Sequence, residues 1–194
     1  KKPKFNLGPF EIEMVHMCHS IPEMHSILLR TPAGNIFHTG DWKYDAKPLI
    51  GLPNNDKHLK KLGDEGVLAV IGDSTNVFNS ESSGSEYELR QSLIDLIKPC
   101  KQLVVVTTFS SNIARMESLI EAAIHCKRKI VLSGQNLRRI FKAGIDSGYF
   151  TNMHKVEFIE EKNIKKHDRN KILVIATGSQ GEPYASVTKL SPSE

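Results

Sequence analysis

The chain has 194 residues, of which 39% are hydrophobic and 25% are charged, and its formal net charge is +4. This length allows one large domain or two small ones, and the composition is typical of an ordinary globular protein. No apolar run approaches the ~20 residues that span a bilayer, so we expect neither a membrane span nor a signal peptide.

The small positive charge is compatible with an anionic partner, but it does not by itself indicate nucleic-acid binding. The three cysteines, Cys18, Cys100 and Cys126, are widely spaced and form no CxxC motif. We therefore expect a reducing, cytoplasmic location and no disulfide framework. The first residue is lysine, so we also expect the chain to be a piece of a longer protein.

The first part of the chain has the pattern of an antiparallel sheet. Apolar and acidic residues alternate along 10–16, which predicts a half-buried strand. Turn residues at 32–35 separate two further strand-like runs, 26–31 and 36–39, and this order predicts a hairpin.

A polar stretch follows, with a short helix predicted at 58–65. The continuous apolar run 67–71 then predicts a fully buried strand. The Ser/Gly-rich segment 77–86 is typical of a boundary. We therefore expect a mainly antiparallel domain at 1–76 and a second domain at 77–194.

The second part of the chain alternates between helices and buried strands. A first helix begins at the capping box formed by residues 85–88, and further helices are predicted at about 112–126 and 136–147. Buried strands are predicted at 103–107, 129–132 and 172–176. Strands that alternate with helices of this length imply parallel βαβ units, so the expected fold class is α/β.

Two residues in the first part, His19 and Asp41, are candidate metal ligands at the ends of adjacent predicted strands. Imidazole and carboxylate suit zinc, and carboxylate also suits manganese or magnesium. A carboxylate can also bridge the two ions of a two-metal phosphodiesterase site. The alternative is a turn histidine and a turn aspartate without a ligand role, because two ligands are too few to hold a catalytic metal.

Asp73 follows the apolar run 67–71. Functional side chains collect at the carboxyl ends of strands in α/β sheets. The alternative is that Asp73 caps its own loop, helped by Ser74 and Asn76.

The segment 108–112 lies between a predicted strand and a predicted helix. Backbone N–H groups at a helix start, together with the Ser111 and Asn112 side chains, form a candidate anion site to which Arg115 adds charge. The alternative is a plain helix cap at Ser111.

Two other segments are weaker candidates for anion binding. The glycine-rich loop 177–183 resembles a phosphate cradle but lacks the P-loop pattern GxxxxGK[ST]. In the run 155–171, lysines and an arginine are interleaved with acids, which favours a solvated connector over an RNA contact.

Five motifs occur in an order that resembles the bacterial ribonuclease J family, in the β-CASP branch of the metallo-β-lactamase superfamily. They are His-Ser-Ile-Pro at 19–22, His-Thr-Gly-Asp at 38–41, Asp-Ser-Thr-Asn at 73–76, Phe-Ser-Ser-Asn at 109–112 and Thr-Gly-Ser-Gln-Gly-Glu-Pro at 177–183. The resemblance implies a partial αββα metallo-β-lactamase sandwich at 1–76. It also implies a β-CASP domain at 77–194, incomplete at its C-terminal end, with a mainly parallel sheet flanked by helices.

The resemblance implies a 5′-to-3′ exonuclease and endonuclease that processes and degrades RNA with two divalent metal ions. Zinc is the expected metal, with manganese or magnesium as alternatives. His19 would ligate one ion, Asp41 would bridge both, and Asp73 would support the active site without touching the metal. The family handles the 5′ end or backbone of RNA at positions that match Ser111, Asn112, Gly178 and Ser179.

The implied partner is RNA, without a membrane, and the full-length enzyme is expected to be a homo-oligomer, either a dimer or a tetramer. The sequence departs from the family pattern because the main metal motif, His-x-His-x-Asp-His, does not occur in it. The later Ser-Gly-His loop and a further metal-binding histidine are also missing. We therefore expect the isolated chain to cleave no RNA, to bind metal poorly and to expose strand edges.

Two interpretations compete with this one. The first is a non-catalytic RNA-binding or assembly module. The second is another hydrolase of the superfamily, either a β-CASP nuclease that acts on DNA or a small-molecule hydrolase.

Overall fold

The structure is a computed structural model that describes residues 4–80, 84–182 and 184–190. The chain divides into two compact units, Lys1–Ser85 and Glu86–Glu194. The division falls nine residues after the boundary predicted between residues 76 and 77. Within the described ranges, no helix is both long enough and apolar enough to cross a membrane.

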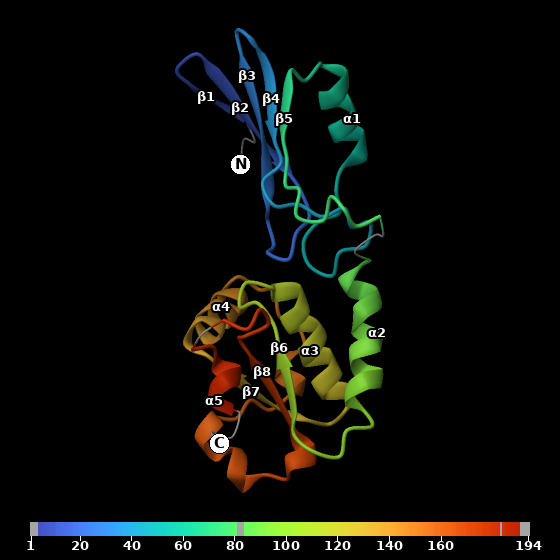
Figure 1. The fold of residues 1–194 in the computed structure, drawn as a ribbon, viewed down its shortest axis with the longest axis vertical. Coiled ribbons are helices and arrows are strands. Elements are labelled where there is room, and N and C mark those ends of the chain that lie inside the picture. Colours follow the sequence, from blue (N-terminus) through green and yellow to red (C-terminus); the bar gives the residue numbers. More distant parts are fainter. Residues whose placement is uncertain (1–3, 81–83, 183, 191–194) are drawn as a thin grey trace. The chain divides into compact units, whose positions relative to one another are not determined.

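The first unit is a five-stranded sheet with one helix packed against it (Figure 1). In spatial order its strands are β1 (Lys4–Leu7), β2 (Phe10–His16), β3 (His25–Thr31), β4 (Gly34–His38) and β5 (Ala69–Ile71). Neighbouring strands are antiparallel, except that β4 and β5 are parallel. The predicted hairpin is confirmed as β3 and β4, whereas the sequence pattern did not predict β1.

The helix α1 (Asp56–Asp64) covers one face of this sheet. Val15 of β2, Leu28 of β3 and Leu62 of α1 are buried together there. Successive side chains of a strand point to opposite faces, so the residues next to these in each strand lie on the other face. That other face is apolar and exposed, and the strand register places on it Phe5, Leu7, Phe10, Met14, Ile27 and Ile71.

The edge strand β5 is less buried than the sequence pattern predicts. The apolar run 67–71 predicts a fully buried strand, but Val70 is 65% exposed and Ile71 is 53% exposed. β5 lies at the edge of the sheet and pairs only with β4 among the strands of the described ranges. A continuous apolar run shows that both faces of a strand are apolar, but it does not show what packs on them. The predicted burial of this strand is therefore wrong.

A buried carboxylate ties the strands to α1. Glu13 is 2% exposed, and its oxygens lie 2.9 Å from Lys4 Nζ, 2.8 Å from Arg30 Nη1 and 2.9 Å from His58 Nε2. Burial raises the pKa of Glu13, but the hydrogen bonds and charges of Lys4 and Arg30 outweigh this effect and hold the pKa below its ordinary value. Because the partners come from β1, β3 and α1, this network joins four elements of the unit.

The second unit is a parallel sheet between helices (Figure 1). Its strands lie in the order β6 (Val104–Thr107), β8 (Ile172–Ala176) and β7 (Lys129–Ser133). Its helices are α2 (Glu86–Ile97), α3 (Ile113–His125), α4 (Gln135–Asp146) and α5 (Ser186–Leu190), with short 3-10 helices at Met153–Lys155, Glu161–Lys166 and Arg169–Lys171. The predicted α/β class is confirmed.

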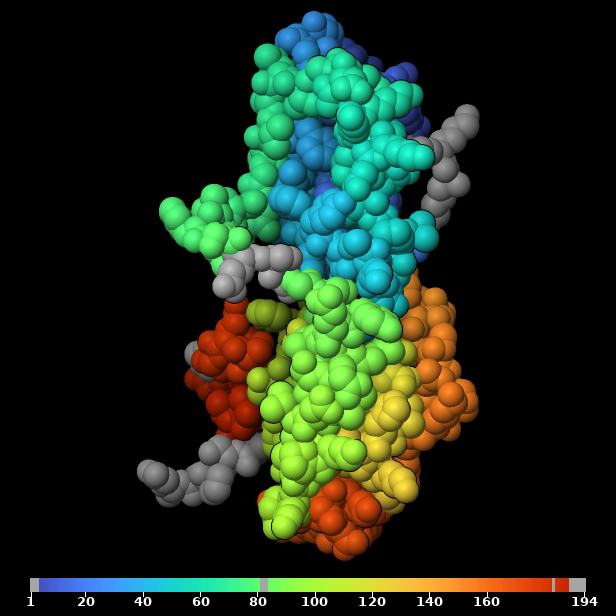
Figure 2. Space-filling view, turned by 90° about the vertical axis from the view of Figure 1, so that its right-hand side faces the viewer, coloured from blue at the N-terminus to red at the C-terminus, as the bar shows by residue number. Residues whose placement is uncertain are grey.

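The central strand β8 holds the core of this unit, because all of its residues are buried. Met116, Leu119 and Ile120 of α3 are fully buried, while α2 (green in Figure 2) lies on the surface of the unit. Since the three strands are parallel, their carboxyl ends meet at one edge of the sheet. The loops that follow β6, β7 and β8 therefore gather at that edge.

Candidate functional site

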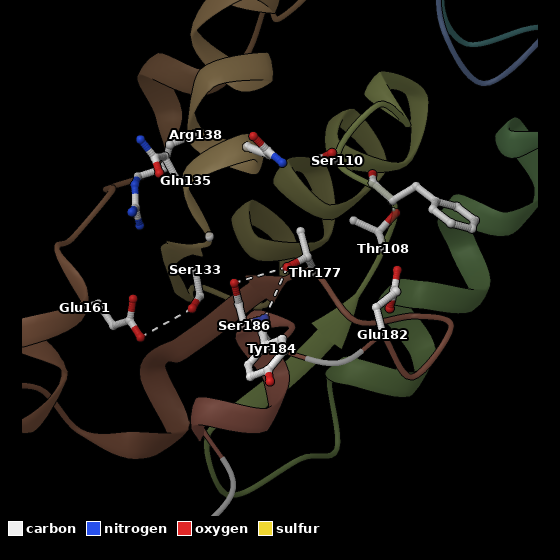
Figure 3. Close-up of a pocket in the computed structure, with 13 residues that line it drawn as sticks. Thr108, Ser110, Ser133, Gln135, Arg138, Glu161, Thr177, Glu182, Tyr184 and Ser186 are labelled. Atoms are coloured by element: carbon white, nitrogen blue, oxygen red, sulfur yellow. Dashed lines mark hydrogen bonds between the residues drawn. The ribbon is translucent and has the colours of Figure 1, made fainter.

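A polar cleft of about 560 Å³ lies at the carboxyl ends of the three parallel strands (Figure 3). Its lining includes Thr108 and Ser110 after β6, Ser133 and Gln135 around the end of β7, and Thr177 and Ser186 after β8. The order β6-β8-β7 places the loops that start α3 and α4 on either side of β8. Open parallel sheets bind ligands in this position, where the loops separate.

Hydroxyl groups in the cleft are held by hydrogen bonds. Ser133 Oγ donates to Glu161 at 3.3 Å, and Thr177 Oγ1 donates to Ser186 Oγ at 3.1 Å. Gly134 joins β7 to α4 with a φ of 122°. A Cβ at this position would lie 2.7 Å from Ser186 Oγ, so glycine allows the close approach of the turn to α5.

The cleft also contains one cation and two carboxylates. Arg138 Nη1 donates to Leu132 O at 3.0 Å, and within the described ranges its guanidinium forms no ion pair. Glu161 accepts from Ser133, and Glu182 accepts from Gln180 N at 3.1 Å. This mixture suits a ligand that offers both anionic acceptors and hydroxyl or N–H donors.

Sequence reasoning missed Arg138, Glu161 and Tyr184 as cleft residues. The signal for Arg138 was a cation in the first turn of a helix that follows a strand and a Ser-Gly pair. Glu161 has no comparable local signal, because it reaches the cleft from a segment far from the strand ends along the chain. Tyr184 directly follows the predicted loop 177–183, but the pattern of that loop did not single out its side chain.

The anion site predicted after β6 is only partly inside the cleft. Ser110 lines the cleft, but Ser111 and Asn112 do not. Asn112 Oδ1 accepts from Arg115 N at 2.9 Å and caps α3, so the cap lies one residue after the predicted alternative at Ser111. The Arg115 guanidinium donates to the Glu86 carboxylate at 2.8 and 3.1 Å. Its charge is therefore paired with a residue of α2.

The glycine-rich loop contributes its ends to the cleft. Thr177 and Glu182 line it, whereas Gly178 and Ser179 do not. A Cβ at Gly178 would clash with Val187 of α5. This glycine therefore serves close packing in the structure, and its backbone is not part of the cleft lining.

In the first unit, the loops after β2, β4 and β5 bring Asp73 near His19 and the Trp42 backbone. Thr75 N donates to Asp73 Oδ1 at 2.9 Å, and the Thr75 hydroxyl donates to the same oxygen. These bonds hold the pKa of Asp73 below its ordinary value, and the charge of His19 and the N–H of Trp42 lower the pKa further. Asp73 therefore caps its own loop, as the alternative interpretation expected, with Thr75 as the partner.

The predicted metal ligands His19 and Asp41 do not complete a metal site. His19 Nδ1 lies 3.3 Å from Ser20 Oγ, and the exposed Asp41 carboxylate forms no hydrogen bond or ion pair within the described ranges. No three His, Cys, Asp or Glu side chains of the described part of the chain are grouped to hold a metal ion. A catalytic zinc takes three protein ligands, so the donors of the described residues are too few to hold a two-metal centre without further ligands.

Comparisons with known proteins agree with the motif order. Residues 101–194 match the family described as Ribonuclease J, beta-CASP domain. Ribonuclease J of Sinorhizobium meliloti is 38% identical over 191 residues, which are 98% of this chain and 34% of that protein. Ribonuclease J of Helicobacter pylori strain 26695 is 34% identical over 100% of this chain and 28% of that protein. This chain thus spans about a third of the length of these curated relatives.

A solved structure shares the fold. It is a crystal structure of a protein of unknown function from Enterococcus faecalis V583, with a TM-score of 0.62 and 16% sequence identity. The match covers 93% of this chain and 44% of that chain. At this identity the likeness shows the fold and carries no information on activity.

Proposed function

The chain belongs to the ribonuclease J family, and we propose that it is part of a metal-dependent ribonuclease that acts in RNA processing and decay. The observation that carries this proposal is identity of 38% along nearly the whole chain to an enzyme named Ribonuclease J. The family match over residues 101–194 supports it independently of the motifs in the first unit. The proposed activities are 5′-to-3′ exonuclease and endonuclease cleavage.

We propose that the polar cleft of the second unit holds RNA. Backbone N–H groups at the start of α4, the hydroxyls of Ser110 and Ser133, and the guanidinium of Arg138 can donate to a phosphate. The predicted residues Ser111, Asn112 and Arg115 lie on the neighbouring turn that starts α3, so their proposed part is to shape this turn. Gly178 similarly holds its loop against α5.

For the metal-dependent step we propose that His19 and Asp41 act only when further ligands are supplied. In the longer enzyme His19 would ligate one divalent ion and Asp41 would bridge two, with Asp73 supporting the site. Zinc is the proposed metal, and manganese or magnesium would also suit these donors. Metal ions in such a centre would activate water and stabilise charge on the scissile phosphate.

The 194-residue chain and a longer protein that contains it should differ in activity. The 194-residue chain should bind RNA in a salt-dependent manner and should show no metal-stimulated cleavage of it. A longer protein that contains this sequence and the missing His-x-His-x-Asp-His motif should cleave RNA, and Asp41→Ala should abolish this cleavage while leaving RNA binding measurable. Robust cleavage by the 194-residue chain, or turnover retained in the Asp41→Ala protein, would refute the assigned roles.

A second candidate for the chain alone is a non-catalytic RNA-binding or assembly module. The polar cleft favours it, because the cleft is formed without any residue of the first unit. Binding of single-stranded RNA without turnover would support this role. Stronger binding of DNA than of RNA of the same sequence would instead favour a DNA-directed member of the superfamily.

A further inference from the structure

Tyr184 is an exposed aromatic residue at the rim of the polar cleft. It is 93% exposed, although it lines the cleft together with Thr177 and Ser186. Figure 3 shows Tyr184 beside Ser186, on a different side of the cleft from Arg138. An aromatic ring that solvent reaches on nearly all sides adds little to packing, and both of its faces are open to a ligand.

The backbone of Tyr184 is also unusual. Its φ is 65°, a left-handed conformation that side chains other than glycine rarely adopt. The turn is closed by Ala185 N, which donates to Glu182 O at 3.1 Å, and Tyr184 occupies the position before this donor, where glycine is favoured. Such strained residues cluster at functional sites.

Lys127 provides a contrast, since it also has a positive φ of 51°. It follows the C-cap Cys126 of α3, and the N–H groups of Lys127 and Arg128 bond back to carbonyls of that helix. This is an ordinary helix ending, in which a left-handed residue is expected. Tyr184 ends no helix, so a capping role does not account for its conformation.

The chemistry of the cleft indicates a nucleotide unit and not a bare phosphate. Arg138 and the hydroxyl groups can donate to a phosphate, but the carboxylates of Glu161 and Glu182 would repel one. Carboxylates accept hydrogen bonds from ribose hydroxyls and base N–H groups. A nucleotide also has a flat base, for which an exposed aromatic ring at the rim is a suitable partner.

We propose that Tyr184 stacks on one unpaired base of a single-stranded RNA whose sugar–phosphate backbone enters the cleft. This inference rests on the proposed function and adds to it the residue that holds the base. Because every base has a π-face, the contact would tolerate any base sequence. It would exclude bases inside a duplex, whose faces are already stacked on their neighbours.

Binding of short RNAs by the 194-residue chain tests the proposal. The probes are a 5′-phosphorylated single-stranded RNA pentamer and the same pentamer with every base removed, each labelled at its 3′ end for fluorescence anisotropy. The variants are Tyr184→Ala, which removes the ring, and Tyr184→Phe, which keeps it. Tyr87→Ala is the matched control, because Tyr87 is 61% exposed on α2 and does not line the cleft.

Tyr184→Ala should weaken binding of the intact pentamer about tenfold and leave binding of the abasic pentamer unchanged. Tyr184→Phe and Tyr87→Ala should bind both probes as the unchanged chain does. Equal weakening on both probes, or no weakening on either, would overturn the stacking role while leaving RNA binding by the cleft intact. Absence of any salt-dependent RNA binding by the unchanged chain would overturn both this inference and the proposed RNA-binding role. Thermal unfolding of each variant shows whether a loss of binding reflects a loss of fold.

Discussion

The two units of this chain differ in how they use their sheets. In the second unit the sheet lies between helices, and every residue of its central strand β8 is buried. In the first unit α1 covers one face, whereas apolar side chains such as Phe5, Met14 and Ile27 are exposed on the other. The central strand of the second unit is thus buried on both faces, whereas the described residues of the first unit cover only one face of its sheet.

Each unit contains a buried glutamate, and the two carboxylates differ in their hydrogen-bond and charge partners. Glu13 of the first unit is surrounded by Lys4, Arg30 and His58. Glu117 of α3 is buried, and one of its carboxylate oxygens has no hydrogen-bond partner among the described residues. Burial raises the pKa of Glu117, and the nearby charge of Arg90 offsets only part of this rise.

The largest expected effect on stability comes from the difference in side-chain burial between the sheets of the two units. Ile172→Ala removes a fully buried side chain from β8 and should lower the free energy of unfolding by about 3 kcal/mol. Ile27→Ala on the exposed face should lower it by about 0.5 kcal/mol. Urea unfolding, with hydrogen exchange to assign each unit, measures both. A loss at Ile27 as large as that at Ile172 would show that the exposed face is covered in solution.

The second-largest effect is expected from removal of the Glu13 carboxylate. Glu13→Gln should lower the free energy of unfolding by about 2 kcal/mol at pH 7, because Lys4 and Arg30 lose a buried charged acceptor. The folded pKa of Glu13 is lowered, so the folded state binds fewer protons than the unfolded state. This contribution is complete above the unfolded pKa of about 4.3 and is lost as the pH falls from there through the folded pKa. A difference between the two proteins that does not shrink on acidification would contradict the ion network.

Removal of the Glu117 charge should change the free energy of unfolding in the opposite direction. Glu117→Gln should raise the free energy of unfolding by about 1 kcal/mol at pH 7, since it removes a poorly solvated charge. The folded pKa of Glu117 is raised, so its favourable contribution is complete below about pH 4.3 and is lost as the pH rises through the folded pKa. The gain from the substitution should therefore appear only as the pH rises. A destabilised Glu117→Gln protein at pH 7 would show that the carboxylate is paired in solution.

The smallest expected effect compares one helix cap in each unit. Asn55 Oδ1 accepts from His58 N at 3.1 Å, and Asn112 Oδ1 accepts from Arg115 N at 2.9 Å. Asn55→Ala and Asn112→Ala should each lower the free energy of unfolding by about 1 kcal/mol, measured by urea unfolding. Asn112→Asp keeps the cap and serves as the matched control. If Asn112→Asp restores stability and RNA binding together, Asn112 acts on RNA only through the shape of the turn.

Local patterns predicted most of the second unit. The three parallel strands and the helices α2, α3 and α4 were expected within a few residues, and Gly148 follows the end of α4 with a φ of 78°. Helical periodicity, buried apolar runs and cap residues act over a few positions, so the sequence records them directly. The first strand, β1, was not predicted from the sequence, because its stability comes from pairing with β2.

The candidate site could be predicted only in outline. The motif order indicated the family. The loops after β6 and β8, in which candidate anion sites were predicted, contribute Ser110, Thr177 and Glu182 to the cleft, whereas the predicted residues Ser111, Asn112, Gly178 and Ser179 lie outside its lining. Which side chains enter the cleft depended on neighbours that no local pattern identifies. Arg115 lies in a predicted anion-binding turn, yet its guanidinium is bound to Glu86, 29 residues away.

The sequence by itself therefore determined the family, the α/β class and most of the segments that form strands and helices, but not β1 or α5, because these features depend on motifs and on short-range periodicity. Only the tertiary structure decided that Arg138, Glu161 and Tyr184 share one cleft, that His19 and Asp41 stand without further metal ligands among the described residues, and that one face of the first sheet is exposed. The physical reason is that strand order and the packing of one element on another bring together residues that are far apart along the chain. Those contacts depend on which surfaces pack against each other, and the residues of a single strand do not determine that packing.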